Sequence, residues 1–223
     1  MSPAAIIVAG GRGRRAVAPD DSTPKQFRRL AGRALFEWSL TAFETFGCSP
    51  IVLVVPAEHV AVVHASHSEA DVIVVEGGRT RQASVANGLD SVATEHVLVH
   101  DAARPFVEQE TIARVTRALR SGAEAAIPCI PAVETIKDTV GDSVVTTVDR
   151  AQLQIAQTPQ GFITTRLRAA HERAVADDFH GTDDAQLFER IGGVVRVVEG
   201  STKNLKITTQ EDLLLAEAVA SRT

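Results

Sequence analysis

Short apolar runs alternate with segments of helical periodicity through the first part of this chain, and this alternation limits the possible folds most strongly. The apolar runs cover residues 4–8, 51–55, 72–75, 96–99 and 125–130. Helical spacing covers residues 35–45, 56–68 and 108–120, and a further helix is predicted to begin after Thr80 as its N-cap. Apolar strands joined through helices form a mainly parallel sheet with helices on both faces. The sequence therefore predicts a Rossmann-like α/β fold.

The alternation is interrupted at about residues 132–152. There two short extended segments flank Gly141 and predict a protruding β-arm, which consists of a hairpin formed by residues 135–138 and 144–148. Because an isolated hairpin is marginally stable at best, we expect the arm to pack on a second subunit and to mediate dimerisation. Beyond it we predict a turn at 157–161, helices at 164–177, 185–191 and 209–220, and strands at 194–198 and 205–207. Residues 1–223 are expected to form one domain that carries this arm.

The composition excludes several classes of protein. The 223 residues carry a formal net charge of −5, so general binding to nucleic acid is not expected. No apolar run approaches the ~18–20 residues of a membrane span, and no secretory signal precedes the first strand. Cys48 and Cys129 form no CxxC pair and are predicted to be buried free thiols. We expect a cytoplasmic protein that binds neither nucleic acid nor membrane.

A cationic glycine loop directly follows the first apolar run. It begins with Ala9, Gly10, Gly11, Arg12 and Gly13, and Arg14, Arg15 and Lys25 lie beyond. Glycines let backbone N–H groups approach a ligand closely, because no Cβ blocks the way. Between residues 12 and 33 there are seven Lys or Arg against two Asp, in a chain that is acidic overall. A polyanion is the expected ligand, and we interpret the segment as a nucleoside triphosphate loop.

Three other interpretations of this loop compete. A glycine-rich strand exit can be only a tight turn with solvated arginines. The Walker pattern requires Gly-Lys-Ser/Thr, which the chain lacks. The dinucleotide fingerprint is met loosely at residues 11–16, but it also requires an immediate helix and an acid at the end of a second strand about 20 residues later. Residues 18–22 instead have the composition of a loop, and the second strand begins only at Ile51.

Two further strand exits carry residues suited to a site. Gly77 and Gly78 follow the third apolar run, and residues 101–104 follow the fourth. Ligands of such sheets bind at the carboxyl ends of the strands. We therefore expect the three exits to share one site.

Seven motifs now stand in order along the chain. They are AGGRGRR at 9–15 with TPKQF at 23–27, GGRTRQASV at 77–85, HDAARP at 100–105, VDR at 148–150, QTPQ at 157–160, TDDA at 182–185 and NLKIT at 204–208. Together they resemble the cytidylyltransferase family of the methylerythritol phosphate route to isoprenoid precursors. The resemblance spans nearly the whole chain. Each motif alone is weak, but seven in register argue against chance.

The resemblance implies a glycosyltransferase-A-like nucleotidyltransferase fold and a homodimer with an exchanged β-arm. It also implies Mg²⁺-dependent transfer of CMP from CTP to 2-C-methyl-D-erythritol 4-phosphate, with release of pyrophosphate. Such a transfer needs no protein nucleophile; it needs in-line positioning and neutralisation of crowded negative charge. Mg²⁺ keeps several waters and bridges phosphate oxygens, so few protein ligands are expected.

The family's functional positions can be transferred to matching residues of this chain. The implied catalytic residues are Arg15, Lys25 and Lys206. The implied nucleotide contacts are Ala9, Gly10, Gly11, Arg12, Gly13, Gly77, Gly78, Arg81, Ser84, Asp101 and Ala102. The implied substrate contacts are Asp101, Arg104, Thr135, Arg150 and Thr182, of which Thr135 and Arg150 lie on the arm. Mg²⁺ is expected mainly on the CTP phosphates, with Asp101 as a possible ligand.

The chain departs from the family pattern at the glycine loop, and this keeps alternatives open. Ala9-Gly10-Gly11 stands where the family more often has Ala-Ala-Gly, and Ala-Gly-Gly is usual in ribitol 5-phosphate cytidylyltransferases. Ala102-Ala103-Arg104 and Thr182-Asp183-Asp184 favour methylerythritol phosphate. A catalytically silent CTP-binding paralogue and a relative that transfers another nucleotide are further alternatives. We expect no appended cyclodiphosphate synthase domain.

Overall fold

The structure is a computed structural model that describes residues 2–10, 25–67 and 71–221. Its strands are β1 (Ala4–Val8), β2 (Arg29–Leu30), β3 (Arg33–Ala34), β4 (Ile51–Val55), β5 (Val72–Glu76), β6 (His96–Asp101), β7 (Ala125–Pro131), β8 (Ile136–Val140), β9 (Ser143–Val148), β10 (Gln154–Ala156), β11 (Gln160–Ile163) and β12 (Val195–Glu199). Its helices are α1 (Leu35–Phe46), α2 (Val60–Ser66), α3 (Arg81–Leu89), α4 (Gln109–Arg120), α5 (Thr164–Ala176), α6 (Asp184–Arg190) and α7 (Gln210–Ala220), with 3-10 turns η1 (Lys25–Phe27), η2 (Ala57–His59) and η3 (Arg150–Gln152).

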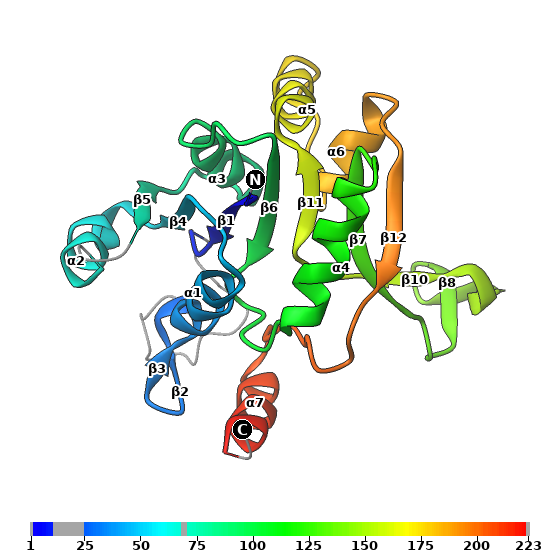
Figure 1. Cartoon of the computed structure of the whole chain (residues 1–223). Helices are drawn as coiled ribbons and strands as arrows, with labels where there is room; N and C mark the ends of the chain where they lie inside the picture. The colour runs from blue at the N-terminus through cyan, green and yellow to red at the C-terminus, as the bar shows by residue number, and fades with distance from the viewer. Residues whose placement is uncertain (1, 11–24, 68–70, 222–223) are drawn as a thin grey trace.

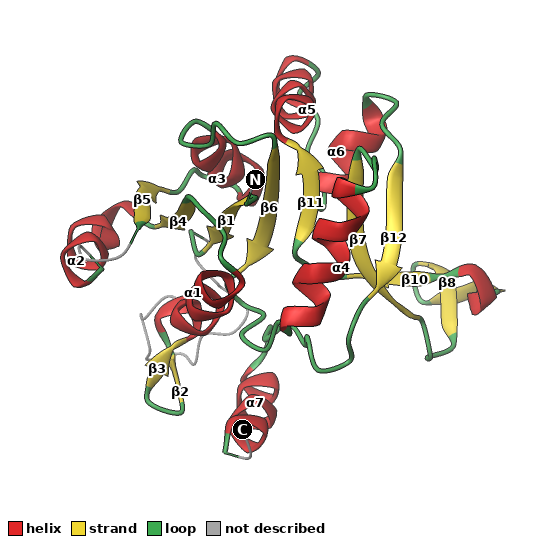
Figure 2. Ribbon diagram, viewed as in Figure 1, coloured by secondary structure: helices red, strands yellow, loops and turns green. Residues whose placement is uncertain are grey.

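An eight-stranded sheet organises the described residues. β5, β4, β1 and β6 are parallel neighbours in that order, and β11 pairs antiparallel with both β6 and β7. β12 pairs parallel with β7, and β10 pairs antiparallel with it. Helices α1 and α4 pack on one face of the sheet and α3, α5 and α6 on the other (Figure 2). The predicted mainly parallel sheet with helices on both faces is confirmed.

Alternation along the central strands directs apolar side chains to both faces. On β1, Ala5 and Ile7 belong to the core under α1 and α4, whereas Ala4 and Ile6 belong to the core under α3 and α5. All four are fully buried. Burying a large aliphatic side chain stabilises the fold by about 1.5–3 kcal/mol, so a strand covered on both faces is apolar throughout. This is why short apolar runs were sufficient to predict the central strands.

Two predicted segments are wrong, one of them in part. Residues 157–161 are predicted as a turn, but only residues 157–159 are irregular; residues 160–161 begin strand β11, where a Cβ on Gly161 would lie 2.5 Å from Cγ1 of Val115 on α4. A glycine inside a strand can mark such a close approach. Residues 205–207, predicted as a strand, are irregular, and the N–H of Ile207 donates to the carbonyl of Ala103 at 2.9 Å. Both segments depend on distant contacts, which local patterning does not report.

The predicted hairpin is present as β8 and β9, and it projects away from the sheet beside β10 (Figure 1). Its turn holds Gly141 at φ 58°, in the left-handed region that favours glycine. Val140, Val144 and Val145 on the hairpin are 74%, 59% and 61% exposed. Within the described residues the hairpin pairs with no other strand. Its exposed valines are therefore candidates for a protein interface.

Two expectations from composition can also be compared with the structure. Cys48 and Cys129 are free and buried, as predicted. Burial raises the pKa of Cys48 to about 12 and that of Cys129 to about 11, so both thiols stay protonated and unreactive. Among the helices described, none combines the length and the apolar character that crossing a bilayer requires.

Candidate active site

Two glycine segments meet at the carboxyl ends of β1 and β5. A Cβ placed on Gly77 would lie 3.1 Å from Cα of Gly10, and one placed on Gly10 would lie 3.1 Å from Oγ of Ser84. Ala9 is buried next to them, and its N–H donates to the carbonyl of Val54 at 2.8 Å. Because side chains at Gly10 and Gly77 would be crowded against these neighbours, the glycines make the close approach of the two strand exits easier. The structure thus brings two of the three strand exits into contact, and their use as one ligand site stays a prediction.

Ser84, on the first turns of α3, holds the second glycine segment in place. Its hydroxyl accepts a hydrogen bond from the N–H of Gly78 at 3.0 Å and donates to the carbonyl of Thr80 at 2.8 Å. Thr80 caps α3, since its side chain accepts from the N–H of Ala83 at 3.0 Å. The predicted N-cap is therefore confirmed. Ser84 shapes the loop, and its contact with a nucleotide stays a prediction.

Asp101, the last residue of β6, lies between two cations. Its Oδ1 accepts from Nε of Arg81 at 2.8 Å, and its Oδ2 accepts from Nζ of Lys206 at 2.6 Å. Burial alone would raise the pKa of this carboxyl, but the charges of Arg81 and Lys206 outweigh burial and hold the pKa well below its usual range. Asp101 is thus ionised at neutral pH. Three residues that the sequence placed far apart form one ion-pair cluster.

The cluster continues into the interior. Nη1 of Arg81 donates to Oδ2 of Asp184 at 2.8 Å, and Nε2 of His171 lies 3.1 Å from the other oxygen of Asp184. Burial would raise the pKa of Asp184, yet the charge of Arg81, followed by His171, lowers it. Asp183 caps α6 and accepts from the N–H of Gln186 at 2.9 Å. The cap places Asp184 in the first turn of α6, where a negative charge is favourable.

A second set of buried polar groups fixes the backbone at Asp101. The hydroxyl of Thr158 accepts from the N–H of Asp101 at 3.1 Å and lies 3.0 Å from Nδ1 of His100. Nε2 of His100 lies 3.1 Å from the carbonyl of Arg104. A carbonyl only accepts, so Nε2 carries the hydrogen and Nδ1 accepts from Thr158. Burial lowers the pKa of His100 to about 4, so the ring is neutral at pH 7.

Arg104 connects the loop after β6 to the segment that carries Lys206. Its Nη1 donates to the carbonyl of Asn204 at 2.7 Å, and its Nη2 donates to the carbonyl of Ala156 at 3.4 Å. Nδ2 of Asn204 in turn donates to the carbonyl of Thr158 at 2.7 Å. These bonds connect the HDAARP, QTPQ and NLKIT motifs to one another. They hold the backbone at Asn204, two residues before Lys206, and so help to position Lys206. Arg104 is 9% exposed, and its contact with a substrate stays a prediction.

Comparison with known proteins gives one family for this arrangement. The profile of the family IspD, 2-C-methyl-D-erythritol 4-phosphate cytidylyltransferase, matches residues 4–222. The chain belongs to this family. The 2-C-methyl-D-erythritol 4-phosphate cytidylyltransferase of Syntrophus aciditrophicus is 42% identical over an alignment 224 positions long. The alignment covers 96% of this chain and 94% of that protein.

Two further relatives agree with membership of the 2-C-methyl-D-erythritol 4-phosphate cytidylyltransferase family. The bifunctional enzyme IspD/IspF of Solidesulfovibrio magneticus is 42% identical over an alignment 232 positions long. The alignment covers 99% of this chain but only 58% of that enzyme. The chain therefore spans a little more than half the length of this relative. The crystal structure of the Thermus thermophilus cytidylyltransferase matches with a TM-score of 0.80 at 36% identity, covering 97% of this chain and 98% of that one.

These matches decide between the alternatives that the motifs left open. The predicted family, enzyme class and nucleotidyltransferase fold are confirmed. The matched family and the relatives are named as cytidylyltransferases of 2-C-methyl-D-erythritol 4-phosphate, which favours an enzyme over a silent paralogue. The roles of individual residues are tested by none of these matches and stay predictions.

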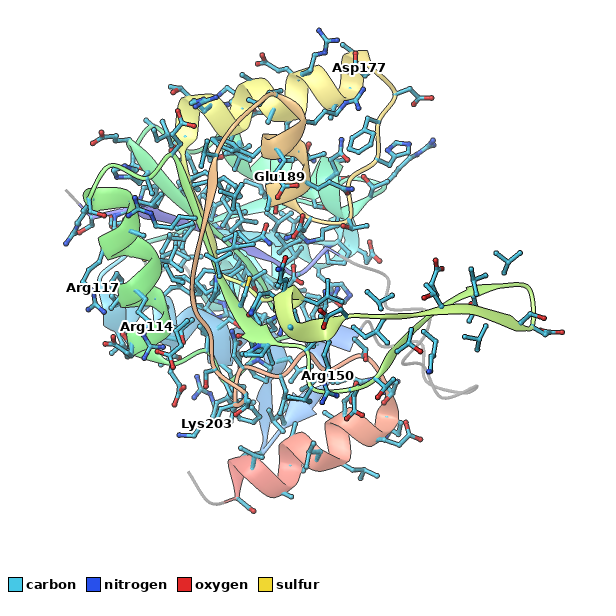
Figure 3. The ribbon with its side chains drawn as sticks, turned by 90° about the vertical axis from the view of Figure 1, so that its right-hand side faces the viewer. Arg114, Arg117, Arg150, Asp177, Glu189 and Lys203 are labelled. Carbon is cyan, nitrogen blue, oxygen red and sulfur yellow. The ribbon has the colours of Figure 1, made fainter. Side chains whose placement is uncertain are left out.

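The remaining predicted site residues fall into two groups. Ala102 is fully buried beside Asp101, and its N–H donates to the carbonyl of Val8 at 3.1 Å. Thr182 is exposed, and its N–H and hydroxyl both donate to Oε1 of Gln186. Thr135 and Arg150 instead belong to the arm and are exposed. Figure 3 shows Arg150 at the root of the arm, where its guanidinium donates to the carbonyl of Val133.

Several predicted residues cannot be placed. Gly11, Arg12, Gly13 and Arg15 lie outside the described residues. Lys25 begins η1, but its side chain also lies outside the described part of the chain. The cationic glycine loop therefore stays a prediction.

Reasoning from the sequence missed the residues that support the site. Asp184 stands within the recognised TDDA motif, but the sequence assigns it no role of its own. Thr158 and Asn204 also belonged to recognised motifs without an assigned role. His100 likewise belongs to the HDAARP motif without an assigned role, and His171 gives no signal, because a single histidine in a helical segment looks like an ordinary helix residue. Only the fold brings these five side chains to the ion-pair cluster.

Proposed function

We propose that this chain transfers CMP from CTP to 2-C-methyl-D-erythritol 4-phosphate, giving 4-diphosphocytidyl-2-C-methyl-D-erythritol and pyrophosphate. The observation that carries the proposal is the ion-pair cluster of Arg81, Asp101 and Lys206, next to two touching glycine segments, in a chain of this family. Backbone N–H groups and fixed cations at strand ends suit a triphosphate.

The reaction is an in-line displacement at phosphorus. An oxygen of the acceptor phosphate forms a bond to the α-phosphorus of CTP, the α–β bridging P–O bond breaks, and its electron pair leaves with pyrophosphate. Negative charge accumulates on the oxygens around the α-phosphorus, where fixed cations stabilise the transition state more than the ground state. We assign this stabilisation to Lys206, Lys25 and Arg15.

Lys206 is the described member of that set. Its side chain is 42% exposed, so the amine can reach a ligand, and Asp101 holds it at the strand ends. A triphosphate would compete with Asp101 for the amine, because both are anionic oxygen ligands. Lys206 is therefore positioned before the substrate arrives, which lowers the entropy lost on binding.

A divalent metal is expected for this chemistry. In the described part of the chain, no three His, Cys, Asp or Glu side chains form a group that could hold a metal ion. Mg²⁺ is commonly held by one or two carboxylates together with substrate phosphates. The ionised Asp101 fits that donor set, and bound Mg²⁺ would neutralise phosphate charge beside Lys206. The remaining coordination would come from CTP and water.

The arm is proposed to complete a homodimer. Val140, Val144 and Val145 are more than half exposed on a hairpin that lacks a partner strand in the described residues. A second subunit would cover these side chains and thereby stabilise the hairpin. Thr135 and Arg150 would then reach the partner's acceptor site, where a guanidinium binds phosphate through two parallel hydrogen bonds. A single domain with an exchanged arm and a cytoplasmic location remain parts of this proposal.

Competition between acceptors tests the proposal. Pyrophosphate release from CTP is measured with Mg²⁺ and with 2-C-methyl-D-erythritol 4-phosphate and ribitol 5-phosphate as competing acceptors. We expect a preference for methylerythritol phosphate. A preference for ribitol 5-phosphate would overturn the acceptor, and CTP binding without turnover on either acceptor would overturn the activity.

A further inference from the structure

Arg81 binds two carboxylates that differ in their exposure to solvent. Its Nε donates to Oδ1 of Asp101 and its Nη1 donates to Oδ2 of Asp184, both at 2.8 Å. The side chain of Asp184 is fully buried, whereas that of Asp101 is 11% exposed at the site. Arg81 therefore divides its charge between a carboxylate of the site and one that is closed to solvent.

The way in which Arg81 binds Asp101 determines which oxygen of Asp101 is available to Lys206. A guanidinium can bind one carboxylate through two parallel N–H groups, which would occupy both oxygens of Asp101. As Arg81 is held, only Nε reaches Asp101, and Nη2 has no hydrogen-bond partner among the described residues. Oδ2 of Asp101 is left for Nζ of Lys206 at 2.6 Å. Without Asp184, Arg81 could turn and displace Lys206 from Asp101.

His171 holds the second oxygen of Asp184. Its Nε2 lies 3.1 Å from Oδ1 of Asp184, and its side chain is 4% exposed. His171 comes from α5 and Asp184 opens α6, and these two helices pack against each other. Each oxygen of Asp184 therefore has one partner, so the carboxylate cannot rotate without breaking a buried hydrogen bond.

We propose that Asp184 and His171 are positioning residues for cytidylyl transfer, because together they fix Arg81 so that Lys206 keeps its place on Asp101. Neither contacts Lys206; each acts through Arg81. The inference rests on the proposed function of Lys206, but the position of its amine can be measured without turnover. Failure of the inference can thus be distinguished from failure of the proposed function.

Asp184→Asn tests the inference through the reactivity of Lys206. The chain has four lysines, so acylation by an amine-reactive reagent can be followed on each by peptide mass spectrometry. Lys137, which is exposed on the arm, serves as the internal reference. When Arg81 moves onto Asp101, Lys206 loses its partner, and its acylation relative to Lys137 should rise about threefold to tenfold.

Asp177→Asn is the matched control. Asp177 also bridges two cations, since it accepts from Nε of Arg173 and from Nη2 of Arg190, both at 2.9 Å. Figure 3 shows Asp177 at the opposite end of the domain from Lys203, which shares a segment with Lys206. The same exchange of acid for amide should leave the acylation of Lys206 unchanged there.

Variants of His171 provide a second test that does not depend on the folding of Asp184→Asn. His171→Leu removes the donor to Asp184, and the acylation of Lys206 should rise about twofold or more. His171→Gln restores an amide N–H at similar reach, and the acylation should return toward the wild-type value. A merely structural role would give no such rescue at equal melting temperature.

Turnover gives an independent readout. If CMP is transferred as proposed, Asp184→Asn should lower kcat about tenfold and change KM for CTP less than about threefold, because it disturbs a group that acts in the transition state. Unchanged acylation of Lys206 in folded Asp184→Asn or in His171→Leu would overturn the inference. Raised acylation in a protein that transfers no CMP would support the positioning and overturn only the proposed function.

Discussion

The ion-pair cluster and the arm differ in how many partners their side chains have within the described chain. At the cluster, Asp101 and Asp184 each have two side-chain partners, and the residues involved come from four helices or strands and from the irregular segment that carries Lys206. On the arm, Val140, Val144 and Val145 are exposed, and the hairpin has no partner strand in the described residues. The cluster is positioned before any ligand arrives. The exposed valines of the arm are proposed to find their contacts on a second subunit.

This difference indicates how the two regions respond to substitution. Removing one partner inside the cluster leaves a buried charge without compensation, which costs more than the lost bond itself. Removing an exposed apolar side chain from the arm changes little within one subunit and weakens only association. Each prediction below tests one side of this contrast.

Lys206→Ala should have the largest effect. Loss of this cation is expected to lower kcat about 10²–10³-fold, because it removes charge stabilisation from the transition state. The fold should persist, since the side chain is 42% exposed. Lys203→Ala is the control on the same segment, where Nζ pairs with the partly exposed Glu108 at 3.1 Å. Steady-state kinetics decide, and turnover near that of Lys203→Ala would remove Lys206 from the catalytic set.

The buried ring of His100 should make stability depend on pH. Burial lowers its pKa to about 4 in the folded protein, whereas an unfolded histidine titrates near ~6.5. Between these values the unfolded chain binds more protons, so the free energy of unfolding should fall by up to about 3 kcal/mol as pH drops from about 6.5 to about 4.

Urea unfolding across that range measures this dependence. His100→Gln should flatten it, while His180→Gln should leave it unchanged, because the side chain of His180 is 75% exposed. An equally steep profile in His100→Gln would assign the dependence to other groups. Asp101 and Asp184 add a loss of stability only at lower pH, because their pKa values are lowered in the folded state.

Val144→Asp should break the arm's contact and leave the domain folded. A charge in an apolar interface is expected to weaken dimerisation about 10–100-fold, which sedimentation equilibrium measures. The melting temperature of the separated subunit should hardly change, since Val144 is 59% exposed. Val175→Asp, at a position 74% exposed on α5, is the control. Equal association of both variants would place the interface elsewhere.

Arg150→Ala should have the smallest effect and should separate the two substrates. Arg150 is assigned to the acceptor phosphate, so KM for the acceptor is expected to rise about tenfold while CTP affinity holds. Arg114→Ala on α4, which removes a guanidinium paired with Glu110 of the same helix and with Glu199 of β12, serves as the control. If CTP affinity falls and acceptor affinity holds, the assignment of the arm is wrong.

Local patterns predicted most of the fold because the central strands are covered on both faces. Residues 4–8 and 51–55 had to be apolar at every position, and that requirement is visible in a short window of sequence. Thr80 was predicted as an N-cap for a similar reason, since the capping bond joins it to Ala83 within one turn. β10 and β11 were not predicted, because short antiparallel strands beside β7 are specified by their partners.

The sequence by itself determined the family, the α/β class and the residue types of the site, because motifs in register and strand exits can be recognised without coordinates. Only the tertiary structure decided how those residues are held. The pairing of Lys206 with Asp101, and of Arg81 with the buried Asp184, joins positions up to 105 residues apart. Such pairings depend on how helices and loops pack on the sheet, and no local pattern encodes a contact between side chains that only packing brings together.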